Sequence, residues 1–522
     1  MRIIDLLERN ASLYGTKSAA VITSEDGTDS TEGGAVSFAE LRHRVLSLAA
    51  GLRAMGVEHG DRLALLADNG LVYFDIYLAG CYLGAPIVPL SIHWTSLELE
   101  SVLNDADPAL VIADETYIAN LPAPDGRTPV ISTQSNAYFD LLAGAPPQDP
   151  NSITQVTEDA VTEDATALIV YTSGTTGNPK GVCLSQRALA FSGFTTALVQ
   201  RFVPEDVFLS TTPLFHTAAG TRVLSMLADG QTHVVLRRFS PETFFAAVAT
   251  HRPSVTILVP TQLRRILEHP ALSQADLSSL RLIVYGGEPA TAALIRQAHT
   301  QLGCNLYQAY GLTECVGNVA GLLPQDHNQA LAQHPERIAS AGRAVPGVRI
   351  EVRNPEGIAV TAGEVGEIWV RTAKAMSGYW KRPQLTAQTL VNGWVCTGDL
   401  GRLDDHGYLY LVGRATDMLI SGGVNLYPSQ IEAVLCEHPH IAAVAVVGRS
   451  DSDWGERPVA FVELEPTPTA LHNPTAIPQE LSLWCASRLS KPQIPDEFIV
   501  VPKLERTSTG KVRKAELKKR LT

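Results

Sequence analysis

A stretch from residue 171 to 182 combines hydroxyl side chains, glycines and a lysine, and it reads Tyr-Thr-Ser-Gly-Thr-Thr-Gly-Asn-Pro-Lys-Gly-Val. Such a stretch offers many hydrogen-bond donors on a backbone that can curve around an anion, which is how proteins hold phosphates. It departs from the common phosphate-loop pattern, because Pro179 and Gly181 flank Lys180 where that pattern has glycine and a hydroxyl residue. The apolar run at 167–170 predicts a buried strand just before it. We therefore predict a loop that binds a nucleotide triphosphate and directly follows a rigid, buried strand.

The segments on both sides of this loop alternate between helical and strand-like patterns. Helical spacing occurs at 38–55, 72–83, 241–250 and 261–268, and strand-like segments occur at 62–67, 85–90, 232–237, 255–259 and 280–285. This alternation is typical of βα units on a parallel sheet. Short strands separated by glycine turns follow between 342 and 410 and predict a small β subdomain. Beyond residue 413, helical and strand patterns return.

The length of 522 residues predicts at least two domains, because single hydrophobic cores stop growing at roughly 250 to 300 residues. We expect an α/β fold with a large N-terminal domain over 1–413, built from two parallel-sheet α/β subdomains and the small β subdomain. A connection at 414–417 would lead to a smaller α+β domain over 418–522.

The composition argues against several classes of protein. A formal net charge of −13 disfavours broad attraction to nucleic acid or anionic lipid. No run of about 20 apolar residues predicts a membrane-spanning helix, and charged residues interrupt the first 14 residues, which therefore lack a signal-peptide core. Seven scattered cysteines without a Cys-x-x-Cys spacing indicate a reducing, cytoplasmic location and give no sign of a disulfide framework or a zinc site.

Further motifs follow the loop along the chain: Pro213-Leu214-Phe215-His216, Gly286-Gly287-Glu288-Pro289-Ala290, Tyr310-Gly311-Leu312-Thr313-Glu314, Thr397-Gly398-Asp399, Gly413-Arg414 and Arg506-Thr507-Ser508-Thr509-Gly510-Lys511. In this order they give the chain a resemblance, over essentially its whole length, to the adenylate-forming superfamily of acyl-CoA synthetases, peptide-synthetase adenylation domains and beetle luciferases. The resemblance implies that ATP activates a carboxylate to an acyl-adenylate with loss of pyrophosphate, and that a thiol then captures the acyl group. AMP is the leaving group that makes the carboxylate a usable electrophile.

The resemblance assigns the contacts of ATP to particular positions. The β- and γ-phosphates would meet Thr172, Ser173, Gly174, Thr175, Thr176, Gly177 and Lys180. The adenine would lie along Gly287, Glu288 and Pro289 and stack on Tyr310, the α-phosphate would meet Thr313 beside Gly311, and the ribose would bind Asp399 and Arg414. Glu314 would hold the Mg²⁺ that bridges the phosphates, because a carboxylate suits this hard cation. Lys511 would neutralise charge during adenylation, and His216 would stand where the acyl pocket meets the reacting centre.

Each assignment has a plain structural alternative. The loop could be a turn rich in glycine and threonine, and His216 could be an interior histidine bonded to backbone. Glu314 could be a surface acid, and Lys511 could belong to a solvated basic tail. The occurrence of all the motifs in family order favours the catalytic interpretation.

The acyl pocket, the thiol tunnel and the hinge follow from the same resemblance. Candidate pocket residues are Phe191, Phe194, His216, Thr217, Ala218, Gly220 and Gly286, which are mostly apolar or small and favour a hydrophobic monocarboxylic acid. Ser421, Gly422 and Gly423 would line the pantetheine tunnel, and Trp454 would stack on the CoA adenine or pack in the core. The C-terminal domain would rotate about Thr416, where relatives commonly have Asp or Lys. An aromatic-Lys-x-Pro segment of many relatives is replaced by Pro492-Gln493-Ile494-Pro495.

We therefore expect an ATP- and Mg²⁺-dependent acyl-CoA synthetase for a fatty or aromatic acid. An amino acid is less favoured, because His216 follows Phe215 where amino-acid-selecting relatives usually place an aspartate. Arg222 could bind a second carboxylate of the substrate, or it could face solvent or pair with an acid of the chain. Two other hypotheses stay open: an adenylating enzyme that loads the phosphopantetheine of a carrier protein, and a non-catalytic nucleotide-binding protein that kept the fold.

Overall fold

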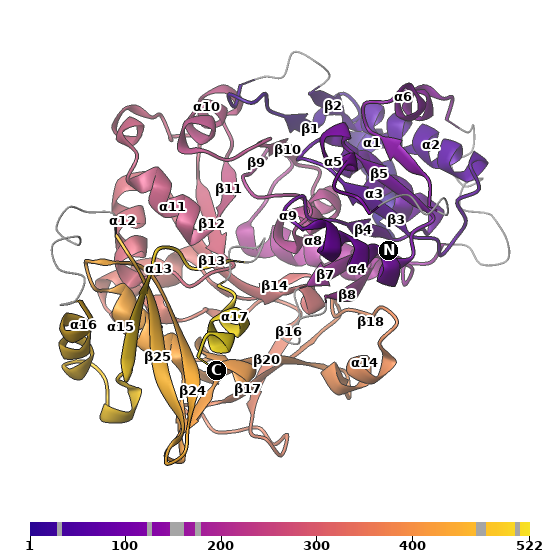
Figure 1. Ribbon diagram of the computed structural model, residues 1–522. Coiled ribbons are helices and arrows are strands. Elements are labelled where there is room, and N and C mark those ends of the chain that lie inside the picture. The colour runs from indigo at the N-terminus through magenta and orange to yellow at the C-terminus, as the bar shows by residue number, and fades with distance from the viewer. Residues whose placement is uncertain are drawn as a thin grey trace. The chain divides into compact units, whose positions relative to one another are not determined.

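A computed structural model describes residues 1–28, 34–122, 128–146, 161–172, 179–465, 477–506 and 512–521 (Figure 1). The chain divides into two compact units. Unit 1 comprises Met1–Ile350 and Val370–Val395, and unit 2 comprises Glu351–Trp369 and Cys396–Thr522. The predicted domain boundary and hinge at 414–417 fall inside unit 2, and they stay predictions.

The first sheet of unit 1 has nine strands in the order β15-β14-β13-β12-β11-β9-β10-β1-β2. Their bounds are β15 (Arg343–Ala344), β14 (Gly317–Leu322), β13 (Asn305–Leu312), β12 (Leu282–Gly286), β11 (Val255–Leu258), β9 (Val207–Ser210), β10 (Thr232–Val235), β1 (Ser18–Ile22) and β2 (Ala35–Ser37). The strands from β13 to β1 pair in parallel, and β2, β14 and β15 join through antiparallel pairs.

The second sheet of unit 1 has seven strands in the order β18-β8-β7-β4-β3-β5-β6. Their bounds are β18 (Gly378–Tyr379), β8 (Lys180–Ser185), β7 (Thr166–Thr172), β4 (Ile87–Pro89), β3 (Leu63–Leu66), β5 (Leu110–Ala113) and β6 (Val130–Ser132). The strands from β7 to β6 pair in parallel, and β8 and β18 are antiparallel additions at one edge.

Helices cover both faces of these sheets. They are α1 (Ile3–Leu13), α2 (Phe38–Ala54), α3 (Leu71–Leu83), α4 (Ser96–Ala106), α5 (Glu115–Ile118), α6 (Asn136–Ala143), α8 (Gln186–Gln200), α9 (Thr217–Ser225), α10 (Pro241–His251), α11 (Pro260–Leu267), α12 (Ala292–Leu302), α13 (Pro324–Ala332) and α14 (Pro383–Thr389). In β3, Leu63 and Leu65 belong to one buried cluster, whereas Ala64 and Leu66 belong to another. Successive side chains of a strand point to opposite faces, so a continuously apolar strand is buried on both sides.

Local sequence signals explain where the helices begin. At the start of α2, Ser37 Oγ accepts from the backbone N–H of Glu40 at 3.2 Å, and the Glu40 carboxylate accepts from the N–H of Ser37 at 2.8 Å. This reciprocal pair satisfies two backbone donors that a helix leaves free at its N-terminus. The observed α2 and α3 agree closely with the helical segments predicted at 38–55 and 72–83.

Unit 2 contains a sheet of order β23-β22-β25-β24, with β26 paired in parallel to β25. Its strands are β22 (Leu419–Ser421), β23 (Val424–Leu426), β24 (Ile441–Asp451), β25 (Gly455–Leu464) and β26 (Glu497–Val501), and its helices are α15 (Pro428–Cys436), α16 (Ile477–Ala486) and α17 (Lys514–Lys519).

A further sheet has the order β16-β17-β20-β19 with β21 paired to β20. Its strands are β16 (Val348–Arg353), β17 (Gly366–Thr372), β19 (Leu390–Val391), β20 (Trp394–Leu403) and β21 (Leu409–Arg414).

The predicted α/β class is confirmed by the parallel sheets. One detail differs from the sequence interpretation, because residues 378–379, inside the predicted small β subdomain, form β18 at the edge of the seven-stranded sheet. None of the helices formed by the described residues is both long and apolar enough to cross a lipid bilayer.

Candidate functional site

The two strands beside the predicted phosphate loop form an antiparallel hairpin. In the register of this hairpin Thr172 of β7 lies opposite Lys180 of β8, so the strand pairing holds the two ends of the loop side by side. The hydroxyl oxygen of Thr172 is buried and has no hydrogen-bond partner among the described residues. Buried polar atoms are normally bonded, and an oxygen of a bound phosphate or its water would satisfy this one. The predicted phosphate contacts of Ser173, Gly174, Thr175, Thr176 and Gly177 lie outside the described residues.

Lys180 joins Glu314 and Tyr379 in one polar network. Its ammonium donates to the hydroxyl of Tyr379 at 2.7 Å, and that hydroxyl donates to Glu314 Oε1 at 2.7 Å. The ammonium also lies 3.4 Å from Glu314 Oε1 and 4.3 Å from the centre of the Tyr379 ring. The side chains of Lys180 and Glu314 are 28% and 13% exposed, so a ligand from solvent can reach both. The structure thus brings together the two charged groups that the sequence assigned to phosphate and Mg²⁺.

Three segments that are distant in sequence build this network. Lys180 begins β8, and Tyr379 lies in β18, which pairs with β8 through Val182. Glu314 lies in the single 3₁₀ turn Thr313–Cys315, and its carbonyl accepts from the N–H of Met376 at 2.7 Å. Tyr379 was not among the residues predicted from the sequence, because residue patterns do not show which neighbour a two-residue strand will pair with.

Lys374 is a second residue that the sequence did not single out. Its side chain is fully buried, and its ammonium donates to the carbonyl oxygen of Asn318 in β14. Burial lowers the pKa of Lys374 to about 8, because an apolar interior disfavours the charged form. Asn318 follows closely after Glu314, so this hydrogen bond helps to fix the backbone just after Glu314.

We expect that Tyr379→Phe will weaken ATP use without unfolding the protein. The change removes the hydroxyl that accepts from Lys180 and donates to Glu314, so both charged groups lose their fixed position. The apparent KM for Mg²⁺-ATP should rise several-fold, and the free energy of unfolding should fall by about 1 kcal/mol. Steady-state kinetics and chemical denaturation measure the two effects.

Tyr117→Phe is the matched control for that variant. Tyr117 also donates its hydroxyl to a carboxylate, that of Asp68, at 2.9 Å, but neither residue carries a predicted role. An unchanged KM for Tyr379→Phe, or an equal change in both variants, would remove Tyr379 from the nucleotide site.

The predicted acyl segment meets the predicted α-phosphate segment at two threonines. The hydroxyl oxygens of Thr217 and Thr313 lie 2.9 Å apart. Thr217 opens α9, and His216 precedes it as the N-cap residue, with its ring 4.5 Å from that of Phe215. The residues assigned to the acid and those assigned to the α-phosphate are therefore neighbours, as transfer between the two substrates requires.

Two predicted pocket glycines stand where a side chain would not fit. A Cβ at Gly220 would lie 2.2 Å from the carbonyl oxygen of Leu214, and one at Gly286 would lie 2.2 Å from that of Ala309. Phe191 in α8 packs beside Gly347, where an added Cβ would come within 2.7 Å of its ring. Phe194 is 42% exposed. The pocket roles of Phe191, Phe194, Ala218 and the two glycines stay predictions.

The predicted adenine loop lies beside the strand that carries Tyr310. Gly286 of β12 pairs in register with Ala309 of β13, the residue before Tyr310. Gly287 follows with φ +83°, a left-handed conformation that favours glycine. Glu288 accepts a hydrogen bond from Thr261 at 2.9 Å. This register places 287–289 and Tyr310 at the same ends of adjacent parallel strands, where α/β proteins bind ligands.

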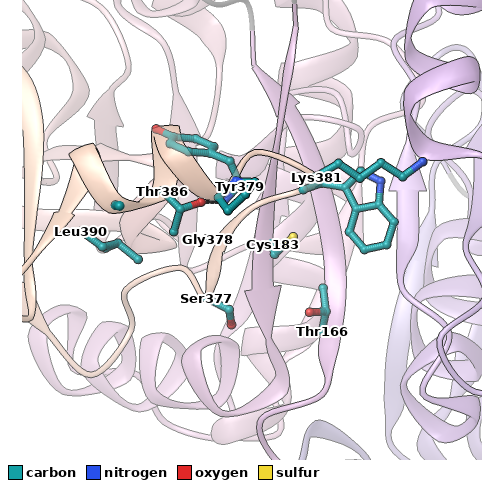
Figure 2. A pocket seen from close by; sticks show the side chains of 11 residues that line it. Thr166, Cys183, Ser377, Gly378, Tyr379, Lys381, Thr386 and Leu390 are labelled. Atoms are coloured by element: carbon teal, nitrogen blue, oxygen red, sulfur yellow. Dashed lines mark hydrogen bonds between the residues drawn. The ribbon is translucent and has the colours of Figure 1, made fainter.

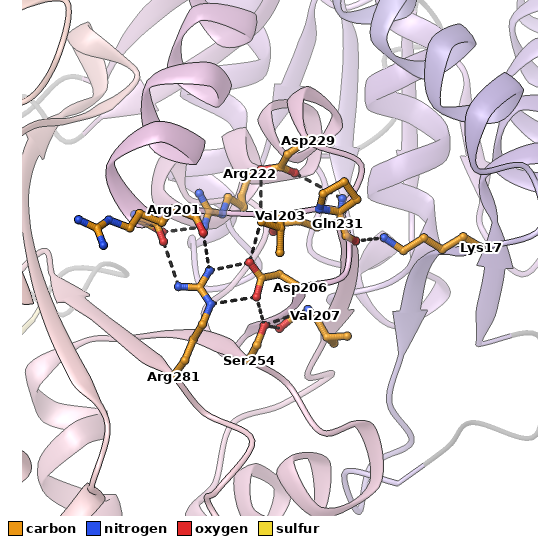
Figure 3. Close-up of polar contacts among 12 residues, drawn as sticks. Lys17, Arg201, Val203, Asp206, Val207, Arg222, Asp229, Gln231, Ser254 and Arg281 are labelled. Carbon is orange, nitrogen blue, oxygen red and sulfur yellow. Dashed lines mark hydrogen bonds and ion pairs between the residues drawn. The ribbon is translucent and has the colours of Figure 1, made fainter.

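Arg222 packs against aromatic rings of the chain. Its guanidinium lies 4.1 Å from the ring centre of Phe208 and 4.8 Å from that of Phe202, and it donates to Gln200 at 3.2 Å. Figure 3 shows Arg222 among neighbouring polar residues that include Arg201 and Asp229. Burial lowers the pKa of Arg222 to about 10 and raises that of nearby Asp229 to about 7. These contacts favour a structural role over the recognition of a second substrate carboxylate.

Tyr379 also lines a pocket of about 390 Å³ (Figure 2). Its lining comes from β7, β8, β18, α14 and β19 and from the residues next to β18, and it includes Thr166, Cys183, Gly378, Trp380 and Leu390. None of the residues predicted to bind ATP or acid lines it. Burial raises the pKa of the Cys183 thiol to about 12, so this cysteine is an inert pocket wall.

Unit 2 brings together the two residues assigned to the ribose. Arg414 Nε lies 2.6 Å from Asp399 Oδ1, across the register of β20 and β21. Thr397 Oγ1 accepts from the N–H of Asp399 at 3.0 Å and donates to the carbonyl of Ile368 at 2.7 Å. The carboxylate is thereby held in one orientation, as bidentate binding of two hydroxyls requires.

The predicted CoA residues also lie together in unit 2. Ser421 ends β22, and Gly422 and Gly423 make the turn to β23 with φ values of +57° and +79°. The N–H of Gly422 donates to the carbonyl of Trp454 at 2.8 Å, and a Cβ at Gly422 would lie 2.6 Å from the indole. Trp454 is 45% exposed, so core packing does not account for it. An exposed indole beside a glycine turn suits stacking on a nucleotide base.

The remaining C-terminal predictions are only partly covered by the described residues. Lys511 lies outside them, although its flanks Arg506 and Val512 form an antiparallel bridge. Thr416 lies in a 3₁₀ turn, Ala415–Asp417, and its hydroxyl is 3.4 Å from the Asp417 carboxylate. The roles of Lys511 and Thr416 stay predictions.

Comparison with known proteins decides the family. The family model of the AMP-binding enzymes matches residues 7–380, and the model of their C-terminal domain matches residues 430–511. This chain is an AMP-binding enzyme. The AMP-binding enzyme is 34% identical to indoleacetate–CoA ligase of Aromatoleum aromaticum over 99% of the chain and 98% of that protein. It is 32% identical to the fatty acid–[acyl-carrier-protein] ligase ScoC of Streptomyces coeruleorubidus, over 94% and 92% of the two chains.

Solved structures agree with the family. The o-succinylbenzoate CoA synthetase of Bacillus subtilis, solved with its acyl-adenylate intermediate, is similar with a TM-score of 0.82 and 29% identity, over 98% of this chain and 97% of that one. The predicted membership of the adenylate-forming superfamily is confirmed, as is the prediction of an AMP-forming ligase. Membership of this family agrees with the nucleotide roles predicted for Lys180, Thr313 and Glu314, and these roles stay predictions.

Proposed function

We propose that this AMP-binding enzyme activates a hydrophobic monocarboxylic acid, aromatic or fatty, to acyl-AMP and then transfers the acyl group to coenzyme A. The observation that carries the proposal is the junction of Lys180 and Glu314 through Tyr379, with the Thr217–Thr313 contact beside Glu314 in the chain. This arrangement supplies a cation for the leaving phosphates and a carboxylate for a metal, next to the segment that is predicted to bind the acid substrate. The relatives that join aromatic or fatty acids to thiols support the acid class and the acceptor.

The first step forms a bond between a carboxylate oxygen of the acid and the α-phosphorus of ATP, and it breaks the bond to pyrophosphate. Lys180 would hold the β- and γ-phosphates, while Thr313 and Lys511 would contact the α-phosphate. Fixed charges that match the developing phosphate charge lower the barrier without reorganising in the step. In the second step the CoA sulfur attacks the acyl carbon, and AMP leaves with the electron pair of the broken bond.

The donor set at Glu314 fits Mg²⁺. Tyr379 and Lys180 contact Oε1, and the described residues leave Oε2 available. The buried, unpaired hydroxyl of Thr172 is a further oxygen next to Lys180 in the strand register. Mg²⁺ prefers one or two protein oxygens together with phosphate oxygens and waters, and when bound it supplies charge neutralisation of the phosphates. Glu314 would hold the metal, and Thr172 would bind a phosphate oxygen or a metal-bound water.

An acid panel tests the substrate class. The purified protein is incubated with Mg²⁺-ATP, CoA and single acids, both aromatic and aliphatic, and AMP release and acyl-CoA are measured together. We expect acid-dependent AMP release with an apolar acid and a matching acyl-CoA. AMP release without acyl-CoA under any acid would contradict the CoA step.

Loading of a carrier protein is the alternative that one relative supports. The same reactions are repeated with a phosphopantetheinylated carrier in place of CoA. If the carrier alone became acylated, the acceptor would be a carrier protein, and the first half of the proposal would stand. An absence of any acid-dependent product would instead favour a non-catalytic nucleotide-binding protein.

A further inference from the structure

Two histidines and a glutamate of unit 2, none of which carries a predicted role, lie together. His438 and His440 lie in the turn between α15 and β24, and Glu480 lies near the start of α16. The two helices pack together through a buried cluster that includes Leu435 of α15 and Leu481 of α16 (Figure 1). The segment that precedes α16 in the chain, 466–476, lies outside the described residues.

The local backbone turns both imidazoles toward the same carboxylate. The N–H of Ile441 donates to the carbonyl of His438 at 3.1 Å and closes the turn between the two histidines. Their ring centres lie 5.2 Å apart at an interplanar angle of 69°. Trp484, one turn along α16 from Glu480, packs edge to face on His438 at 4.9 Å. The rings are thereby fixed before any ligand arrives.

Two of the three distances between the ligand atoms have the spacing of a tetrahedral metal site. Glu480 Oε1 lies 3.2 Å from His438 Nε2 and 3.5 Å from His440 Nδ1, and all three atoms are within 4.8 Å of one another. Zinc bonds of about 2.0 to 2.2 Å in tetrahedral geometry separate neighbouring ligand atoms by about 3.4 Å. Two of the three edges therefore already match a bound cation.

His440 supplies the independent sign that a ligand belongs here. Its Nδ1 is buried and has no hydrogen-bond partner among the described residues, and it faces Glu480. His438 is 4% exposed, whereas the Glu480 side chain is 45% exposed, so the site is closed on the protein side and open to solvent on the other. Buried polar atoms without partners are uncommon in native proteins.

We propose that His438, His440 and Glu480 bind one divalent transition metal ion, Zn²⁺ by preference, with water completing the coordination. Two imidazole nitrogens and a carboxylate oxygen suit zinc, whereas Mg²⁺ prefers oxygens alone. The site uses no cysteine, so the cysteine spacing that gave no sign of zinc does not bear on it. The inference goes beyond the proposed acid–CoA ligation and is independent of it.

Metal binding requires one proton to change place. In the structure the backbone N–H of His440 donates to Nδ1 of His438 at 3.3 Å, so Nε2 carries the proton and faces Glu480. If a metal binds Nε2 of His438, the ring proton must move to Nδ1. The protonated Nδ1 can no longer accept from the N–H of His440, so that long hydrogen bond is lost. The metal would connect α16 to the turn between α15 and β24 and would stabilise the packing of the two helices.

Titration with Co²⁺ and Zn²⁺ tests the site on the full chain after treatment with a chelator. We expect one equivalent of Co²⁺ to give the visible absorption of a tetrahedral nitrogen and oxygen site, without the charge-transfer bands of a thiolate, and Zn²⁺ to displace it. His440→Gln and Glu480→Gln should each weaken binding by more than about tenfold, since loss of even an outer-shell partner costs roughly 10- to 100-fold. Zn²⁺ should also raise the Tm of the unaltered protein but not that of either variant.

His334→Gln is the matched control. His334 Nδ1 lies 3.3 Å from Glu336 Oε1, the same kind of pair without a second histidine. This variant should bind Co²⁺ like the unaltered protein and keep the Tm shift. Equal affinities in all four proteins, thiolate bands, or no binding at all would overturn the proposed site, whatever the result of the acid panel.

Discussion

Lys511→Ala is expected to slow formation of acyl-AMP by about 10²- to 10³-fold, the usual effect of removing one group that stabilises transition-state charge. Transfer from supplied acyl-AMP to CoA should stay close to that of the unaltered enzyme. The reason is that the family assigns this lysine to the α-phosphate and carboxylate during adenylation only. Pyrophosphate exchange measures the first step, and acyl-CoA formation from synthetic acyl-AMP measures the second.

Lys514→Ala separates this role from that of a basic tail. Lys514 follows Lys511 closely in the chain, and its ammonium is paired with Glu432 at 2.7 Å. We expect the exchange rate of this variant to stay near that of the unaltered protein. Equal loss in both variants would support the tail interpretation, and equal loss of both half-reactions in Lys511→Ala would contradict a role confined to adenylation.

Glu314→Gln should have the second largest effect, because it removes the carboxylate assigned to Mg²⁺. The amide still accepts a hydrogen bond from Tyr379, so the local packing is kept, but Lys180 loses its anionic neighbour at 3.4 Å. We expect the Mg²⁺ concentration for half-maximal rate to rise more than about tenfold and the maximal rate to fall by about 10². Rates measured over a range of Mg²⁺ at saturating ATP give both quantities.

Glu242→Gln controls for the loss of an acid elsewhere. Glu242 is exposed and pairs with His269 at 2.9 Å, so its variant should keep the normal Mg²⁺ dependence. Glu314→Gln combined with Tyr379→Phe should be non-additive, since the two groups share one network. An unchanged Mg²⁺ dependence in Glu314→Gln would remove Glu314 from the metal.

The sequence predicted those features that depend on neighbouring residues. The apolar run at 167–170 became β7, and the alternating segments became the parallel sheets, because the period of apolar residues reflects which faces are buried. Thr313 and Glu314 were found because their motif is contiguous. Thr217 was assigned only to the acyl pocket, and the structure adds its 2.9 Å contact with Thr313.

The features that the sequence missed depend on pairings between distant segments. Tyr379 lies 199 residues from Lys180, and only the pairing of β18 with β8 brings them together. A buried lysine such as Lys374 is not predicted from sequence patterns, because charged side chains are rarely fully buried. The His438-x-His440 spacing is local, but Glu480 joins it only because α15 and α16 pack on each other.

Acid-dependent exchange of labelled pyrophosphate into ATP tests the central claim most directly, because it reports reversible formation of acyl-AMP and needs neither CoA nor a carrier protein. We predict that exchange requires Mg²⁺ and an apolar aromatic or aliphatic acid, and that it is nearly lost in Lys511→Ala and strongly reduced in Glu314→Gln. No exchange with any acid of a broad panel, from protein that is folded and binds ATP, would contradict the assignment of this chain as an acid-activating enzyme.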